Sequence, residues 1–409
     1  MSHQASSEFQ LRWRITFLLI TMLLASVGFG VVLPTLPFLA RQLHASDLEF
    51  GLAISLFSVA QLLGSPLWGR ASDRIGRRPI LMIGVTGYGV SSALLALAPN
   101  VLTLLALRAL AGGFVGAVGP GVQGLAADWT GPRERAKVIG YTAAMNGIGF
   151  VIGPLVGTVL GLINARAPFV GVGALALLNA ALGLYFLPRE GPPAQWAGPV
   201  PPGPGMRAPR IFGGLDGALW RRFMPFYVAS IVLSTAYSNI ATVLAFFFVD
   251  HLHTASSTAG WGFAVNGGVA AVIQLALLPR VYDRLRERMT LILGFVMGAV
   301  GYAVLAVSPT LVMALAGIVI FAGARGFAFP TLTTAVSLRA PEDRQGISLG
   351  WRQTCIGIGR TVGPLVASAL YAVHEQLPFL IASGLLAATA IYFGLAVRSA
   401  PGVSTEPRG

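Results

Sequence analysis

Long apolar runs separated by short polar turns extend along the whole chain. A helix that crosses a bilayer needs about 20 consecutive apolar residues, and twelve segments of the sequence have close to that length or more. The pattern therefore predicts an all-α membrane protein with twelve transmembrane helices. The predicted spans are 15–38, 51–69, 79–98, 101–126, 137–161, 168–187, 222–249, 260–279, 290–308, 311–337, 345–371 and 377–397.

The second half of the sequence repeats the first at a constant offset of 210 residues. Chance produces scattered matches but not one register across five predicted helices. The repeat predicts two pseudo-symmetric, parallel six-helix bundles with a substrate site near the midplane between them. The matches pair Arg70, Asp73, Arg74, Arg78, Gly84, Pro99, Pro120, Gly147, Gly149 and Gly153-Pro154-Leu155-Val156 with Arg280, Asp283, Arg284, Arg288, Gly294, Pro309, Pro330, Gly357, Gly359 and Gly363-Pro364-Leu365-Val366.

The two repeats are joined by a segment of different composition. Residues 188–220 are rich in proline and glycine and lack apolar periodicity, which is typical of a linker. The predicted organisation is an N-terminal bundle at 1–187, a cytoplasmic linker at 188–220, and a C-terminal bundle at 221–409 that ends in a short tail. The first apolar run is too long for a removed signal peptide and lacks a small-residue cleavage site, so it is expected to be the first helix.

Composition and charge agree with a membrane protein. Only 11% of the residues are charged, against about 25% in soluble domains. The net charge of +13 does not indicate nucleic-acid binding, because 22 of the 28 Lys and Arg residues fall on one predicted side and only Arg41 and Arg166 fall on the other. Cationic loops stay in the cytoplasm, so both termini are expected there, with the chain in the inner (plasma) membrane. The single cysteine, Cys355, excludes an intrachain disulfide.

The short loop between the second and third spans carries a motif, G-x-x-x-D-R-x-G-R-R, in residues 69–78. It resembles the cytoplasmic loop motif of major facilitator superfamily transporters, in which this loop stabilises the outward-open state. The resemblance implies that Asp73 faces the start of the eleventh helix, near 343–345, and that Arg77 pairs with Asp128. A carboxylate is favoured at a helix N-terminus, and arginine suits a carboxylate partner. The alternative is a topology signal only. The gating-loop candidates are Gly69, Asp73, Arg74, Gly76, Arg77, Arg78 and Asp128.

The second copy of this motif is degraded. Pro279, Arg286 and Glu287 stand where the first copy has glycine, glycine and arginine. The first copy is therefore the better candidate for a working gate.

Two further motifs lie within predicted spans. Arg108, followed by two glycines, resembles the helix-4 motif of the same family; an arginine in lipid is costly, so it should face a cavity or a partner unless it snorkels to the surface. The fifth span carries a Gly-Pro-x-x-Gly pattern that resembles the antiporter motif of proton-coupled drug exporters, and most of both halves resembles tetracycline-type efflux pumps. Small residues at this spacing also serve ordinary helix packing. The antiporter-motif candidates are Gly149, Gly153, Pro154 and Gly157.

The sequence departs from the tetracycline-type pattern in its charges. Ala25, Ser91 and Gly298 stand where such exporters carry intramembrane acids, and all fifteen acids lie in loops or near span ends. Instead, three arginines lie inside the second half, where they favour an anionic or carbonyl-rich substrate or bond backbone carbonyls at kinked helices. Each polar neighbour is a candidate ligand contact or an interhelical hydrogen bond. The substrate-cavity candidates are Arg325, Arg352, Arg360, Gln61, Asn146, Tyr237, Asn239, Asn266, Gln274 and Gln353.

These observations predict a secondary transporter that exports a small amphiphilic molecule by alternating access, coupled to protons. The alternative is an exchanger or facilitator for an anionic small molecule that uses the arginines without protons. A non-transporting receptor would need partner-binding domains, which termini this short are not expected to supply. No phosphate-binding loop, metal cluster or catalytic dyad is apparent, so we expect no enzyme activity, cofactor or metal. The expected partners are a small-molecule substrate and the lipid bilayer, without nucleic acid, and the expected state is a monomer.

Overall fold

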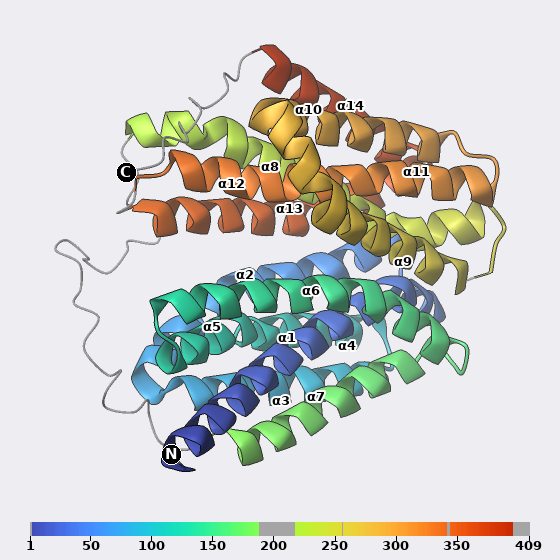
Figure 1. Ribbon diagram of the computed structural model, residues 1–409. Coiled ribbons are helices and arrows are strands. Elements are labelled where there is room, and N and C mark those ends of the chain that lie inside the picture. The colour runs from blue at the N-terminus through green and yellow to red at the C-terminus, as the bar shows by residue number, and fades with distance from the viewer. Residues whose placement is uncertain (1, 188–216, 256, 342–343, 396–409) are drawn as a thin grey trace, which may run out of the picture.

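The computed structural model describes residues 2–187, 217–255, 257–341 and 344–395, and these ranges contain helices and no strand. Figure 1 shows two layers of helices, one built by the first half of the chain (blue to green) and one by the second half (yellow-green to red). The elements of the first layer are α1 Ser2–Gln42, α2 Asp47–Ile75, α3 Arg77–Leu95, α4 Val101–Val115, α5 Val118–Trp129, α6 Pro132–Gly161 and α7 Ala167–Phe186. The elements of the second layer are α8 Gly217–Asp250, α9 Ser257–Val272, η1 Ile273–Leu277, α10 Leu278–Ala306, α11 Leu311–Gly323, η2 Ala324–Ala328, α12 Phe329–Arg339, α13 Gln345–Val373 and α14 Leu377–Leu395.

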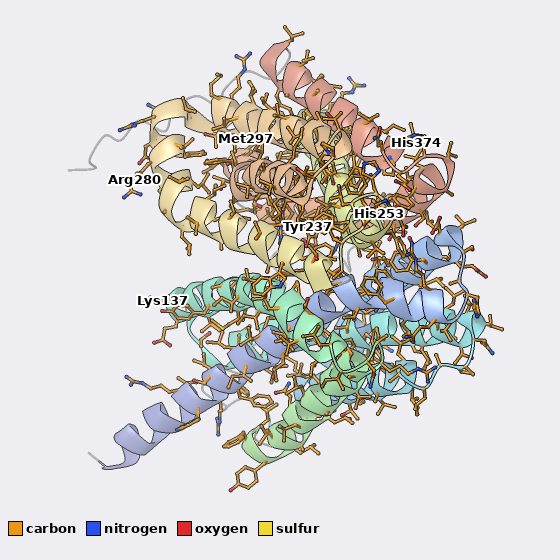
Figure 2. All side chains as sticks on the ribbon, turned by 90° about the vertical axis from the view of Figure 1, so that its right-hand side faces the viewer. Lys137, Tyr237, His253, Arg280, Met297 and His374 are labelled. Atoms are coloured by element: carbon orange, nitrogen blue, oxygen red, sulfur yellow. The ribbon has the colours of Figure 1, made fainter. Side chains whose placement is uncertain are left out.

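The described residues form eleven helical segments that are long and apolar enough to cross a membrane, where the sequence predicts twelve. The difference arises at one place, because the eighth and ninth predicted spans belong to one stretch of 49 residues, Thr258–Ala306. The backbone of this stretch leaves the helical region at Arg286, where φ is 60° and ψ is 177°. Figure 2 shows the chain turning back near Arg280, so that the segment before it and the segment around Met297 run in different directions. One continuous stretch therefore contains two crossings joined without a loop.

The turn at Arg286 matches a turn in the first half. Gly76, which lies 210 residues earlier, also has a positive φ of 97°. A non-glycine residue with this backbone conformation is strained. The second copy of the loop motif has therefore lost its glycine but kept the backbone geometry that the glycine would favour.

The sequence repeat is also a repeat of helix packing. In the first half, Gly153 on α6 packs against α1, where an added Cβ would lie 2.7 Å from the Cα of Gly30. In the second half, the equivalent Gly363 on α13 packs against α8, where an added Cβ would lie 2.7 Å from the Cβ of Ser238. Glycines at such positions let two helix backbones approach closely, so the same device joins the first and fifth spans of each half.

Three further features of the structure differ from the predicted spans and linker. The fourth predicted span is divided at Gly116–Ala117 into α4 and α5, and the tenth contains a π-helical turn, η2, between α11 and α12. Helix α8 begins at Gly217, inside the predicted linker, whose residues 188–216 lie outside the described part of the chain.

The two halves meet through α1, α2 and α6 on one side and α8, α9 and α13 on the other. Close contacts lie toward the end that the arginine distribution assigns to the outside, called the external end below. There Ser55 donates a hydrogen bond to the carbonyl of Thr361 (2.7 Å), and the rings of Phe50 and Phe246 pack edge to face with centroids 4.9 Å apart. Toward the opposite end, no residue packs closely against Gly350 of α13, because an added Cβ there would meet no atom within 4 Å.

Candidate functional site

Two arginines of the second half lie against aromatic rings where the two halves meet. The guanidinium carbon of Arg325 lies 5.5 Å from the ring centre of Phe150 on α6 and 4.3 Å from that of Tyr237 on α8. The guanidinium carbon of Arg360, on α13, lies 5.1 Å from the ring centre of Phe29 on α1. Figure 2 shows Tyr237 at the level where the two layers meet. Both cations therefore contact the opposite half of the protein instead of pointing into lipid.

A π-helical turn positions Arg325. Such turns leave backbone groups unpaired and occur often at functional sites. Here Arg325 lies in η2, and its carbonyl accepts a hydrogen bond from the side chain of Gln274 (3.2 Å), which lies in the other π-helical turn, η1. The Arg325 guanidinium donates to the side-chain oxygen of Asn266 at 3.4 Å, a long and therefore weak hydrogen bond.

The first half contributes an aromatic cluster formed by Phe29, Phe57 and Phe150. The ring of Phe29 lies 5.7 Å from that of Phe57 and 5.3 Å from that of Phe150. Arg108 lies behind this cluster: it is buried, stacks on Phe57 at 4.3 Å, and donates to the carbonyl of Ala53 (3.3 Å). Arg108 therefore has a partner inside the first half and does not snorkel to the surface.

Arg352 lies apart from this interface. It is buried within the second half, where its guanidinium donates to the carbonyl of Phe329 (2.9 Å) and stacks on the same residue's ring at 4.9 Å. This is the backbone-carbonyl bonding that the sequence left open as the alternative to a cavity role. Asn239 has a comparable role, since its amide donates to the carbonyl of Pro378 (2.8 Å). Of the remaining polar candidates, Gln61 and Asn146 are half-buried and Gln353 is exposed.

Among the described residues, no hydrogen bond or ion pair joins Arg325 or Arg360 to a carboxylate. The structure thus brings Arg325, Arg360, Tyr237 and Asn266 together with an aromatic cluster that the sequence did not single out. Phe29 and Phe150 gave no signal of their own, because aromatic residues in apolar spans are ordinary. We call Arg325, Arg360, Tyr237, Asn266 and the aromatic cluster the interface site.

The loop motif contains the ion pair that the family resemblance implies. Arg77 pairs with Asp128 and also donates to the carbonyl of Gly124, which ties the start of α3 to the end of α5. Asp73 is exposed and makes no hydrogen bond or ion pair with a described residue. Of residues 343–345, toward which it was expected to point, residue 343 lies outside the described part of the chain, and Asp73 makes no hydrogen bond or ion pair with Arg344 or Gln345.

The second half contains the counterpart of this ion pair with the charges exchanged. Glu287, which stands 210 residues after Arg77, accepts a hydrogen bond from Arg339 on α12 at 2.6 Å. Arg339 follows the equivalent of Asp128 by one position. The interpretation of the second motif as merely degraded is therefore incomplete, because its acid and base have exchanged places. The 210-residue offset indicates this pair only if an acid may replace a base and one partner may shift by one position.

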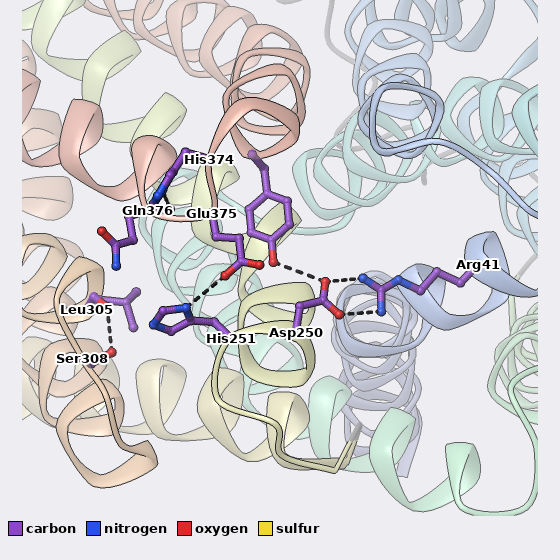
Figure 3. A network of polar contacts seen from close by, with 9 residues as sticks. Arg41, Asp250, His251, Leu305, Ser308, His374, Glu375 and Gln376 are labelled. Carbon is purple, nitrogen blue, oxygen red and sulfur yellow. Dashed lines mark hydrogen bonds and ion pairs between the residues drawn. The ribbon is translucent and has the colours of Figure 1, made fainter.

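An ion pair of a different kind joins the two halves to each other at the external end (Figure 3). Arg41, at the end of α1, donates to Asp250, at the end of α8, with one distance of 2.9 Å. The hydroxyl of Tyr371 on α13 donates to the same carboxylate at 3.4 Å. The neighbouring pair, His251 and Glu375 at 3.0 Å, lies wholly within the second half. The Arg41–Asp250 pair therefore crosses between halves, whereas the His251–Glu375 pair does not.

Asp250→Asn is expected to increase the population of molecules whose external end is open. Partly exposed ion pairs contribute about 0–1 kcal/mol, so the increase is expected to reach at most about five-fold. The measurement is the rate at which a cysteine at position 55 reacts with a membrane-impermeant maleimide in a Cys355→Ser background. Ser55 is 2% exposed, so it reacts only when the halves separate.

The matched control is His251→Gln, which removes the polar contact between His251 and Glu375 from the same region without affecting a contact between the halves. It is expected to leave the labelling rate unchanged. Equal labelling of the two variants would contradict a role for the Arg41–Asp250 pair in holding the external end closed.

With this geometry established, comparison with known proteins places the chain in a family. The sequence profile of the Major Facilitator Superfamily matches it twice, over residues 18–225 and 226–409. The chain belongs to the Major Facilitator Superfamily, so it is a multi-pass inner-membrane transporter and not an enzyme. The two matches correspond to the two halves of the fold.

Similar sequences cover nearly the whole chain. The chain is 31% identical over 363 residues to the class C tetracycline resistance protein of Escherichia coli. That alignment covers 87% of this chain and 89% of the tetracycline resistance protein. The chain is 30% identical over 386 residues to multidrug resistance protein 1 of Bacillus subtilis strain 168, in an alignment that covers 91% of this chain and 93% of that protein. Identity to the quinolone resistance protein NorA of Staphylococcus aureus is 27% over 380 residues, again with 91% and 93% covered.

Solved structures share the fold at lower identity. A bacterial homologue of the human lysosomal transporter Spinster, inward-facing and occupied, aligns with a TM-score of 0.77 at 16% identity, covering 94% of this chain and 96% of that one. The nucleoside transporter NupG aligns with a TM-score of 0.76 at 16% identity, covering 93% and 98%.

Proposed function

We propose that this protein exports small amphiphilic molecules across the inner membrane by alternating access, in exchange for protons. The observation that carries this function is the interface site, where polar side chains of the second half meet aromatic rings of the first half near the middle of the fold. Relatives named for resistance to tetracycline, to multiple drugs and to quinolones support export as the direction and drug-type compounds as the substrates.

The positions of the contacts support alternating access. Contacts such as the Arg41–Asp250 pair and the Ser55–Thr361 hydrogen bond hold the halves together at the external end. The interface site lies deeper, so a rocking motion of the halves would expose it to one side of the membrane and then to the other. Asp73 and the Arg77–Asp128 pair lie at the opposite end, where we propose that the loop motif stabilises the outward-open state.

Proton coupling is supported by the antiporter-type glycines of α6. Gly149, Gly153 and Gly157 all face α1, where added Cβ atoms would collide with the backbone near Leu23, Val27 and Val31. The alternative function is the exchange of anionic small molecules without proton coupling. It is favoured by the absence, among the described residues, of a carboxylate bonded to Arg325 or Arg360.

The test is a transport screen in proteoliposomes, with and without an imposed proton gradient. We expect amphiphilic drugs to move in the export direction and this transport to stop when the gradient is collapsed, because the proton gradient supplies the energy for the exchange. Transport that does not respond to the gradient would exclude proton exchange and favour the anion exchanger. The control is the same protein with the gradient replaced by an equal membrane potential.

A further inference from the structure

The interface site has an uneven distribution of charge and aromatic surface. The second half presents the guanidinium groups of Arg325 and Arg360, and the first half presents the rings of Phe29 and Phe150. Arg325 lies over Phe150 and Arg360 lies over Phe29, and the centres of these two rings are 5.3 Å apart, so both guanidinium groups lie beside one pair of packed rings. Two like charges near the middle of a membrane protein repel each other and favour a negative charge between them.

Arg360 is the strongest indication of a ligand. It makes no hydrogen bond with a described residue, although a guanidinium carries five donors. It is only half-buried, so its donors remain accessible. Arg325 uses one donor in the weak bond to Asn266. Arg352 and Arg108, in contrast, each donate to a backbone carbonyl inside their own half.

The surroundings of these guanidinium groups define the rest of the ligand. Arg360 lies over the ring of Phe29, and that ring packs against those of Phe57 and Phe150. Aromatic rings in offset or edge contact stabilise a further ring placed beside them. A planar ligand that stacks here would bring a substituent on its edge within reach of both arginines, which can bind a carboxylate through two parallel hydrogen bonds.

We propose that the interface site binds a planar aromatic compound that carries a negative charge. The ring lies against Phe29 and Phe150, and the anionic group is bound by Arg360 and Arg325. This inference rests on the proposed export function and specifies its substrate class. A cationic amphiphile is disfavoured, because it would be placed beside two positive charges in a site where no described carboxylate pairs with them.

The experiment measures binding to the full-length protein, purified in detergent, by isothermal titration. The probe is 1-naphthoate, compared with its neutral methyl ester, with the cation 1-naphthylmethylammonium and with the non-aromatic anion cyclohexanecarboxylate. We expect naphthoate to bind at least about ten-fold more tightly than each comparison compound. Equal or tighter binding of the ester or the ammonium compound, or no binding of naphthoate, would overturn the proposal.

Variants assign the binding to the site. Arg360→Gln is expected to weaken naphthoate binding by about ten-fold or more while leaving the ester unaffected, and Arg360→Lys should recover part of the loss because it restores the charge without the planar fork. Arg166→Gln, which removes an exposed positive charge at the external end, is the matched control and should change nothing. An Arg360→Gln variant that is folded by thermal unfolding and binds naphthoate normally would contradict the assignment.

The outcome is distinguishable from failure of the proposed function. Movement of neutral or cationic amphiphiles in proteoliposomes, without movement of naphthoate, would overturn the substrate class and leave export intact. Binding of naphthoate without movement of any compound under any gradient would overturn export and leave the binding site intact.

Discussion

Substituting alanine for Gly112 is expected to prevent the first half of the protein from folding stably. Gly112 lies on α4 against α2, where an added Cβ would lie 2.8 Å from both the Cα and the carbonyl carbon of Phe57 and closer still to its oxygen. These are backbone atoms, so no side-chain rotation relieves the overlap and the helices must separate. Overpacking of this kind costs about 1–3 kcal/mol and occasionally more, and a backbone collision belongs at the upper end.

Separation of these helices would also break contacts of Arg108. Its hydrogen bond to Ala53 and its stacking on Phe57 both join α4 to α2. A buried guanidinium that loses its partners is costly in a membrane interior. The two effects act in the same direction, so the variant is expected to be lost or to unfold at a markedly lower temperature in detergent.

Gly113→Ala is the matched control on the same helix. An added Cβ there meets no atom within 4 Å. Alanine is favoured over glycine in a helix interior by about 1 kcal/mol, so this variant is expected to be as stable as the parent or slightly more stable. The measurement is the thermal unfolding midpoint of each purified variant. Equal midpoints for Gly112→Ala and Gly113→Ala would contradict the packing shown by the structure.

The overall architecture could be predicted from the sequence because it depends on strong, additive signals. Apolar runs of membrane-spanning length set the number of crossings, and the repeat set the equivalence of the halves. The connection between the eighth and ninth spans was not predictable in detail, because residues 280–289 are rich in charged side chains yet remain helical except at Arg286. Polarity marks the end of a hydrophobic span but does not by itself end a helix.

The sequence predicted how deep in the membrane each candidate residue lies, but not the side of its helix from which its side chain projects. Arg352 and Arg360 lie eight residues apart on α13, and nothing in the sequence distinguishes the roles of these two arginines. The structure directs Arg352 to the carbonyl of Phe329 within its own half, and Arg360 to the ring of Phe29 in the other half. Direction around a helix depends on which neighbours pack against it, and the π-helical turn at Arg325 shifts that direction again.

Glu287→Ala is expected to destabilise the second half by about 3–5 kcal/mol, the cost of removing one partner from a buried ion pair. The side chains of Arg339 and Glu287 are only 8% and 7% exposed, and Arg339 also stacks on Phe226 at 4.6 Å. Without the carboxylate, a guanidinium would remain buried with only the carbonyl of Ala335 as a hydrogen-bond acceptor among described residues. The measurement is the free energy of unfolding in detergent, from a denaturant titration.

The equivalent pair of the first half provides the control. Arg77 and Asp128 are 31% and 22% exposed, so solvent screens the charge that Asp128→Ala leaves behind, and the expected cost is about 1 kcal/mol or less. Replacing Glu287 and Arg339 together by methionine should recover most of the stability, because the cost arises from the unpaired charge more than from the lost attraction. A double variant as unstable as Glu287→Ala, or an equal effect in both halves, would show that burial does not distinguish the two pairs.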